Sequence, residues 1–179
     1  MKKDSKYFLD ILLRYFIIMI VALPNLALFY FIFTPLTIYG VYFLLGLFFP
    51  IVLSGEIILL NNNLFIYLIP ACVAGAAYYL LFILNLSIPN IKISKRISLI
   101  LFAFLAFFII NLLRIFVLSV LYFNGFPFFD LFHKFLWYFG SVIITAGIWF
   151  LEVYFFKIKD IPFYSDLRFI YKKSLFNKK

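Results

Sequence analysis

The sequence predicts an all-α polytopic membrane protein, a helical bundle of about five transmembrane helices within one domain over residues 1–156. Composition is the first reason. Hydrophobic residues fill 67% of the 179 positions and charged residues only 13%, which excludes a water-soluble domain of this size. Segment length is the second, since the apolar residues run in stretches of about 20, enough to cross roughly 30 Å of hydrocarbon as a helix.

The net charge of +9 reflects membrane orientation rather than nucleic-acid binding, because most Lys and Arg lie at the chain ends and in the loop at 92–96. These residues flank apolar runs, and such basic flanks stay on the cytoplasmic side of a membrane. Residues 157–179 are therefore expected to form a basic cytoplasmic tail. The first apolar run is longer than that of a signal peptide and no cleavage site follows it, so we expect the N-terminus to be retained.

The apolar sequence of residues 16–54 is long enough for two helices, which we place near 12–33 and 36–53 around Pro24 and Pro35. Two spans here leave the N-terminal lysines outside the cell, against the positive-inside rule. Either one of the two segments is re-entrant, or the seven basic residues of the tail set the orientation. We favour the second explanation.

Two β-prone runs, at 57–60 and 64–69, flank a triple-Asn turn at 61–63. They predict a short hairpin at the membrane surface before the third helix. Pro70 ends the second run and begins that helix. A hairpin in this position can bind a peptide by strand addition.

Three more helices are expected, at about 71–86, 97–123 and 131–156. The basic loop between the first two should be cytoplasmic, so the helix at 97–123 runs outward. The sequence at 124–127, Asn-Gly-Phe-Pro, then turns the chain outside the membrane. The last helix returns inward, which agrees with a cytoplasmic tail.

Arg114 is the most informative single residue because it lies inside an apolar span, where a guanidinium costs about 2.5 to 3.5 kcal/mol. It precedes Leu121 by seven residues, or about 10 Å, which places it in the outer half of the bilayer. Asn111, one turn earlier, shares its face and can hold it by a hydrogen bond. The alternative is an arginine that only extends to the outer headgroups.

His133 is the only histidine and begins the last helix on the outside, three residues after Asp130, which can fix its tautomer. Cys72 is the only cysteine and lies just after Pro70, where unpaired N–H groups and the helix dipole favour a thiolate. Alone, the histidine is an incidental interfacial residue and the cysteine a small buried hydrophobe.

Together, Cys72, Arg114 and His133 lie on three different helices at the same outer depth. A thiol, a proton carrier and a fixed cation are the groups that acyl transfer needs: a nucleophile, a general acid and base, and a stabiliser of the oxyanion. One His and one Cys do not make a zinc site, so we expect no metal and no cofactor.

At these residues the sequence resembles the exosortase and archaeosortase family of membrane cysteine transpeptidases. The matching strings are PACVAG around Cys72, NLLRI around Arg114 and FHKFLWYFG around His133, and their order carries the resemblance over residues 50–156. Val73 departs from the pattern, because the family has Thr or Ser after the Cys. The chain is also shorter than typical members, which suggests missing N-terminal helices.

The resemblance implies a protein-sorting enzyme of the plasma membrane with its active site facing the exterior. Its partners would be secreted proteins that end in a short motif, a transmembrane helix and a basic tail. Cys72 would form a thioester with the cleaved chain, Arg114 would hold the oxyanion, and His133 would protonate the leaving amine. A membrane lipid would then accept the protein.

Two other functions fit the same residues. In a small transporter or channel subunit, Arg114 would bind an anion and His133 would relay protons, without any need for the cysteine. In a structural membrane protein or assembly factor the three residues would be incidental. Replacing Cys72 separates these readings, since only transpeptidation depends on the thiol.

Overall fold

The computed structural model describes residues 2–23, 25–60 and 64–173. It is mostly helical, with 74% helix and 7% strand. The elements in chain order are α1 (Lys2–Ala22), α2 (Ala27–Gly46), β1 (Ile51–Ser54), β2 (Ile57–Leu60), β3 (Phe65–Tyr67), α3 (Pro70–Val73), α4 (Gly75–Leu86), α5 (Ile93–Phe123), α6 (Phe129–Phe135), the π-helix η1 (Leu136–Gly140), α7 (Ser141–Phe155) and α8 (Tyr164–Lys173).

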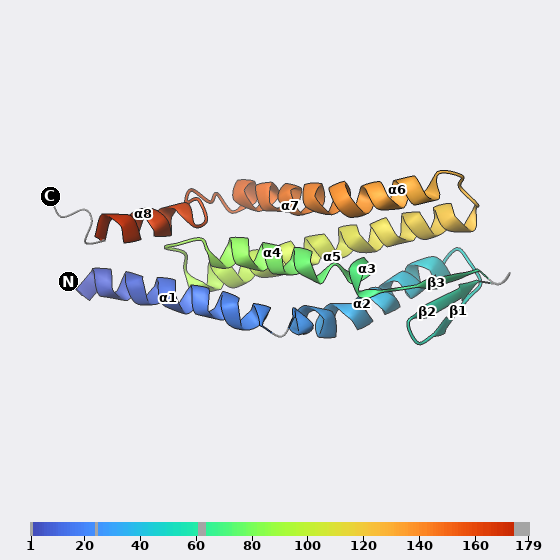
Figure 1. Ribbon diagram of the computed structural model, residues 1–179, viewed down its shortest axis with the longest axis horizontal. Helices are drawn as coiled ribbons and strands as arrows, with labels where there is room; N and C mark the ends of the chain where they lie inside the picture. The colour runs from blue at the N-terminus through green and yellow to red at the C-terminus, as the bar shows by residue number, and fades with distance from the viewer. Residues whose placement is uncertain (1, 24, 61–63, 174–179) are drawn as a thin grey trace.

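The molecule is a long rod whose helices run along its main axis (Figure 1). The small sheet β1–β3 lies at one end, which we call the sheet end. The beginning of α1 and the end of α8 lie together at the other end, which we call the termini end. The helix-to-helix turn before α5 is also near the termini end, and the turn after α5 is at the sheet end.

Three helical segments are long and apolar enough to cross a membrane: Ala27–Gly46, Ile93–Phe123 and Phe129–Phe155. A shorter apolar helical segment, Pro70–Leu86, packs among them. Five separate spans, as expected from the sequence, are not confirmed.

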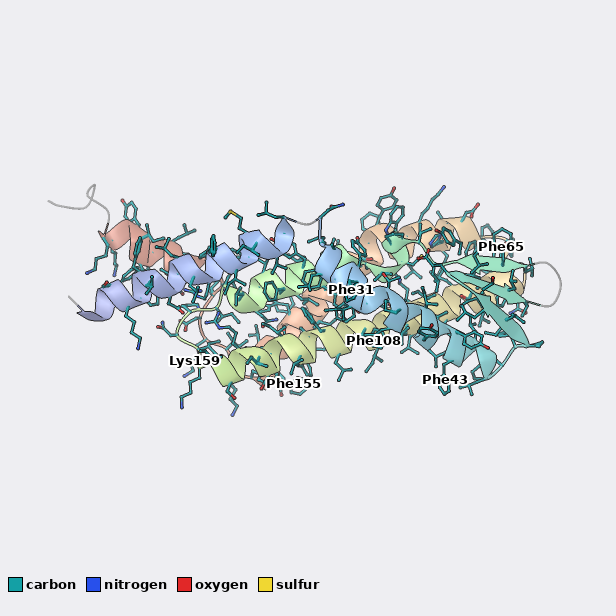
Figure 2. All side chains as sticks on the ribbon, turned by 90° about the horizontal axis from the view of Figure 1, so that it is seen from below. Phe31, Phe43, Phe65, Phe108, Phe155 and Lys159 are labelled. Carbon is teal, nitrogen blue, oxygen red and sulfur yellow. The ribbon has the colours of Figure 1, made fainter. Side chains whose placement is uncertain are left out.

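The long sides of the rod carry an apolar surface that is compatible with a lipid environment. At most 33% of each crossing window is buried inside the protein, so most of the apolar residues face outward. Figure 2 shows such side chains along the length of the molecule, among them Phe31, Phe43 and Phe155, while Lys159 lies toward the termini end. Phe31 is 82% exposed, and exposure of this large apolar side chain is unfavourable in water but not in hydrocarbon.

The N-terminal helices divide at a different place from the one predicted. The expected helices at 12–33 and 36–53 are replaced by α1 and α2, and Pro35 lies inside α2. The break falls instead at Asn25 and Leu26, which both take left-handed backbone conformations. A proline is tolerated within an apolar helix because neighbouring groups can satisfy the backbone that it leaves free.

α1 and α2 run in the same direction, rather than out and back as predicted. Arg14 of α1 donates to the carbonyl of Leu86 at the end of α4, and Tyr30 of α2 packs on Gly75 at its beginning. Both helices are thus antiparallel to α4 and together make one passage along the rod (Figure 1). The N-terminal lysines therefore share an end with the basic loop and tail, and the expected conflict with the positive-inside rule does not arise.

The predicted hairpin is a three-stranded antiparallel sheet of order β1-β2-β3. Its first strand, β1, was expected to be the end of a helix at 36–53, which is wrong. Pro50 disfavours helix in the residue before it, and the β-branched Ile51 and Val52 that follow suit a strand. Gly55 turns the chain with a φ of 63°. The triple-Asn turn at 61–63 lies outside the described residues.

The three later helices have the predicted order with shifted ends. The helix expected at 71–86 is divided into α3 and α4 by Ala74, whose backbone is left-handed. α5 begins four residues before the expected 97, and the helix expected at 131–156 spans α6, η1 and α7. Within the expected tail, α8 is a helix that packs back on α1.

Aromatic residues of α2, α4 and α5 fill the middle of the rod. The rings of Phe33 and Tyr78 stack with centroids 3.7 Å apart, and Phe107 meets Tyr78 edge-on at 4.8 Å. Gly75 allows α2 to come this close, because a Cβ there would lie 2.8 Å from the Tyr30 ring. This packing holds α4 in place and so fixes the position of α3 at its beginning.

At the termini end, a buried ion pair fastens α8 to α1. Both terminal nitrogens of Arg14 donate to Asp166, each at 3.0 Å, and both residues are at most 3% exposed. Tyr7 and Tyr15 also donate to Asp166, at 2.9 and 3.3 Å. Burial and the hydrogen bond to Asp166 raise the pKa of Tyr7 to about 12, so its phenol stays protonated as a donor at neutral pH.

Candidate active site

Cys72 lies in α3, a four-residue helix that begins at Pro70 and ends before the left-handed Ala74. A helix this short leaves most of its carbonyls without helical partners. Two side chains of α5 supply donors: Asn111 Nδ2 donates to the Cys72 carbonyl at 2.9 Å, and an Arg114 terminal nitrogen does so at 3.4 Å. The backbone of Cys72 is therefore held at a fixed place against α5, and its side chain is half-buried.

Arg114 connects α3 to α7. Its other terminal nitrogen donates to the hydroxyl of Ser141 at 2.9 Å, while its buried Nε has no hydrogen-bond partner among the described residues. No carboxylate in the described part of the chain pairs with it. A guanidinium has five N–H groups, so each terminal nitrogen keeps one N–H for a further acceptor.

Arg114 lies far along α5 from the termini end of the rod. Arg96, near the start of the same helix, donates to the carbonyls of Leu86 and Ile88 at the end of the adjacent helical segment. Arg114 follows it by 18 residues, or about 27 Å of helix. Since the hydrocarbon is roughly 30 Å thick, the cation is placed near the boundary at the sheet end.

His133 is on α6, and its exposed ring stacks on Phe129 with centroids 5.6 Å apart. The described residues show no hydrogen bond between His133 and Asp130, so the expected fixing of its tautomer by Asp130 is not seen. Asn111 also differs from expectation, since it binds the Cys72 carbonyl and no bond joins it to Arg114. Its contribution to the site is to position α3.

Cys72, Arg114 and His133 line the same two adjoining cavities. The smaller one, about 60 Å³, also contacts Ile69 and Trp137. The larger one, about 210 Å³, extends to β3 and to the end of α5. The structure thus brings the three predicted residues together, from three different elements.

A π-helical turn between α6 and α7 aligns this face of the last helix. His133, Trp137 and Ser141 are four residues apart in turn, and in a regular α-helix eight residues end about 80° away from the starting face. The wider turn of η1 between them reduces this offset, so that His133 lines the cavities while Ser141 meets Arg114. Sequence reasoning missed Ser141 and Trp137, although the spacing of four from His133 could have indicated them.

Val73, the departure from the family pattern, is fully buried in the apolar core and does not line either cavity. A hydroxyl at this position would point into that core rather than toward the thiol. The local geometry therefore gives the apolar residue a packing role.

A second buried polar pair lies nearer the termini end. Glu152 of α7 is fully buried, and Asn85 Nδ2 donates to its two carboxyl oxygens at 3.2 and 3.0 Å. It follows Ser141 by 11 residues, or about 16 Å, so it is separate from the cavities. Sequence reasoning missed this pair too, although a carboxylate within an apolar span is itself a signal.

The hydroxyl of Ser141 is expected to stabilise the fold through Arg114. Ser141→Ala leaves a partly buried guanidinium N–H without its acceptor, which costs about 1 kcal/mol. Reversible unfolding in mixed detergent micelles measures the loss. Ser98→Ala is the matched control, because the exposed Ser98 bonds only within its own helix. Equal effects of the two variants would contradict the assigned contact.

Comparison with protein-family models, with curated proteins and with solved structures gives no match to this chain.

Proposed function

We propose that this protein is a membrane cysteine transpeptidase of the exosortase and archaeosortase type. The observation that carries the proposal is the convergence of Cys72, Arg114 and His133 on shared cavities. A nucleophile, a cation with free donors and an imidazole are the groups that acyl transfer requires. The resemblance of the three sequence strings around these residues is a further support.

The basic residues support an orientation with the sheet end outside the plasma membrane. The N-terminal lysines, the loop at 92–96 and α8 all lie at the termini end (Figure 1), which the positive-inside rule assigns to the cytoplasm. The cavities then open at the outer boundary of the bilayer. Substrates would be secreted proteins that end in a short motif, a transmembrane helix and a basic tail.

In the first half-reaction, the Cys72 thiolate attacks the carbonyl carbon of the scissile peptide bond. Free N–H groups of Arg114 donate to the oxyanion that develops. The carbon–nitrogen bond then breaks, and His133 gives a proton to the leaving amine. The part of the substrate on the N-terminal side of the cleaved bond remains attached to Cys72 as a thioester. The released helix carries the basic tail away.

In the second half-reaction, His133 takes the proton of an acceptor nucleophile, which we propose is a hydroxyl or amine of a membrane lipid. The acceptor attacks the thioester carbonyl, and the sulfur leaves as a thiolate. The secreted protein is thereby joined to the lipid and anchored at the cell surface. The chemistry uses only groups of the chain and the two substrates.

Trapping the thioester tests the proposal. Membranes that contain the protein and its secreted precursor are quenched with acid, and Cys72 is analysed by mass spectrometry. We expect an adduct that neutral hydroxylamine removes and that Cys72→Ala lacks. If hydroxylamine releases no acyl group while the precursor is being processed, the proposed function is wrong.

A further inference from the structure

The strand β3 has one neighbour, because the sheet order is β1-β2-β3. Two backbone bonds show which of its residues face that neighbour. Leu60 N donates to the carbonyl of Leu64 at 2.9 Å, and Leu68 N donates to the carbonyl of Glu56 at 3.2 Å. Hydrogen-bonded residues alternate in an antiparallel pair, so the even-numbered residues of this strand bond to β2.

Phe65 and Tyr67 therefore direct their N–H and C=O groups away from β2, along a free edge. Their side chains are 57% and 51% exposed, and in the described structure no second strand lies along the edge that faces away from β2. An edge of this kind is a template for another extended chain.

The free edge adjoins the candidate active site. Residues 65–68 line the larger cavity together with Cys72, Arg114 and His133. Ile69 continues the extended backbone, and α3 begins at the next residue. From Phe65 to Ile69 the edge is about 13 Å long, which is enough for about four residues of an added strand.

We infer that an extended segment of the secreted substrate binds as a fourth strand along β3 and so brings its scissile bond to Cys72. The inference rests on the proposed function and specifies how that site holds its substrate. Main-chain bonds to Phe65 and Tyr67 supply the binding, as in other cases of strand addition.

The cavity beside the strand disfavours basic side chains. Apart from Arg114 and His133, its lining is apolar or neutral and includes Ile115, Leu118 and Phe129. A basic side chain placed there would face the guanidinium at short range. The recognised segment is therefore an extended peptide without a basic side chain in this cavity.

A tethered peptide tests the inference. Cys72 is the only cysteine, so a peptide with an activated disulfide attaches at this position alone. The probe is acetyl-Ala-Val-Ala-Val-cysteamine carried as its 2-thiopyridyl disulfide. The Cys72 sulfur displaces thiopyridone and forms the new S–S bond, so no added oxidant is needed.

Amide hydrogen exchange of the tethered full-length protein in micelles is the measurement. We expect the Phe65 and Tyr67 amides to exchange at least tenfold more slowly with the peptide attached. By the same alternation, the backbone amides of Ile51 and Leu53 point outward from β1, the strand at the opposite edge of the sheet. The exchange rates of these amides should stay unchanged. Unchanged rates at β3, or equal slowing at both edges, would overturn the inference.

Backbone methylation of the probe gives a second readout. A methyl on the nitrogen of alternate peptide residues should restore fast exchange, and a methyl on the others should not. Protection of Phe65 and Tyr67 that grows with protein concentration in the absence of peptide would instead assign this edge to a second copy of the chain.

The outcomes separate this inference from the proposed function. A trapped thioester with no protection at β3 overturns the strand alone. Protection at β3 with processing that needs no thioester overturns the transpeptidase, because the tether requires only an accessible sulfur.

Discussion

Cys72→Ala is expected to lower the rate of precursor processing by at least about a thousandfold, as removal of a nucleophile does in other enzymes that act through an acyl intermediate. Pulse-chase labelling of the secreted precursor in cells measures the rate. Transport or a scaffolding role would survive this substitution, so the result also distinguishes the alternative functions.

The structure explains why this loss can be assigned to the sulfur. Both side-chain hydrogen bonds to residue 72 are accepted by its backbone carbonyl, so Asn111 and Arg114 keep these contacts in the variant. The folded protein should therefore unfold at nearly the same detergent composition as the wild type. A variant that processes precursor at more than a tenth of the normal rate would contradict a nucleophilic role.

Asp166→Ala is expected to destabilise the attachment of α8 by about 3 to 5 kcal/mol, because it leaves Arg14 buried without its main partner. Arg14 would keep only the partly exposed Asp10 and the carbonyl of Leu86. Trypsin cleavage after Arg168 measures the detachment, and we expect it to become at least a hundredfold faster.

Two further variants control this prediction. Asp160→Ala removes an exposed acidic residue from the connection just before α8 and should leave the cleavage rate unchanged. The double variant Arg14→Met with Asp166→Leu should recover part of the stability, since it leaves no unpaired charge in the interface. Equal cleavage of Asp166→Ala and Asp160→Ala would show that the pair does not hold α8.

The class of fold could be predicted from the sequence because lipid imposes a length on apolar helices. The segments at 97–123 and 131–156 were recognised within a few residues of α5 and of the α6–α7 segment. The direction of α2 was not predictable in the same way. A short non-helical segment between two helices can either leave the chain direction unchanged or reverse it. Packing of α2 against α4 determines which of the two forms.

For the candidate site, sequence reasoning found the residues and their common depth, but not how they are held. The order of Cys72, Arg114 and His133 on successive helices suggested a meeting place, since alternating helices return to the same side. The bond from Arg114 to Ser141 depends on the π-helical turn, which has no reliable sequence signal. Asp130 was expected to assist His133 on the basis of spacing alone, whereas in the structure the His133 ring stacks on Phe129.

The collinear pair α1 and α2 gives the protein a property useful for engineering. Because the beginning of α1 and the end of α8 lie at the same end of the rod, one copy can be followed directly by another in a single polypeptide. Only a flexible hydrophilic linker is required, without any extra apolar segment to return the chain. A concatemer of this kind could carry a silenced copy beside an intact one, and thus show whether each unit works independently.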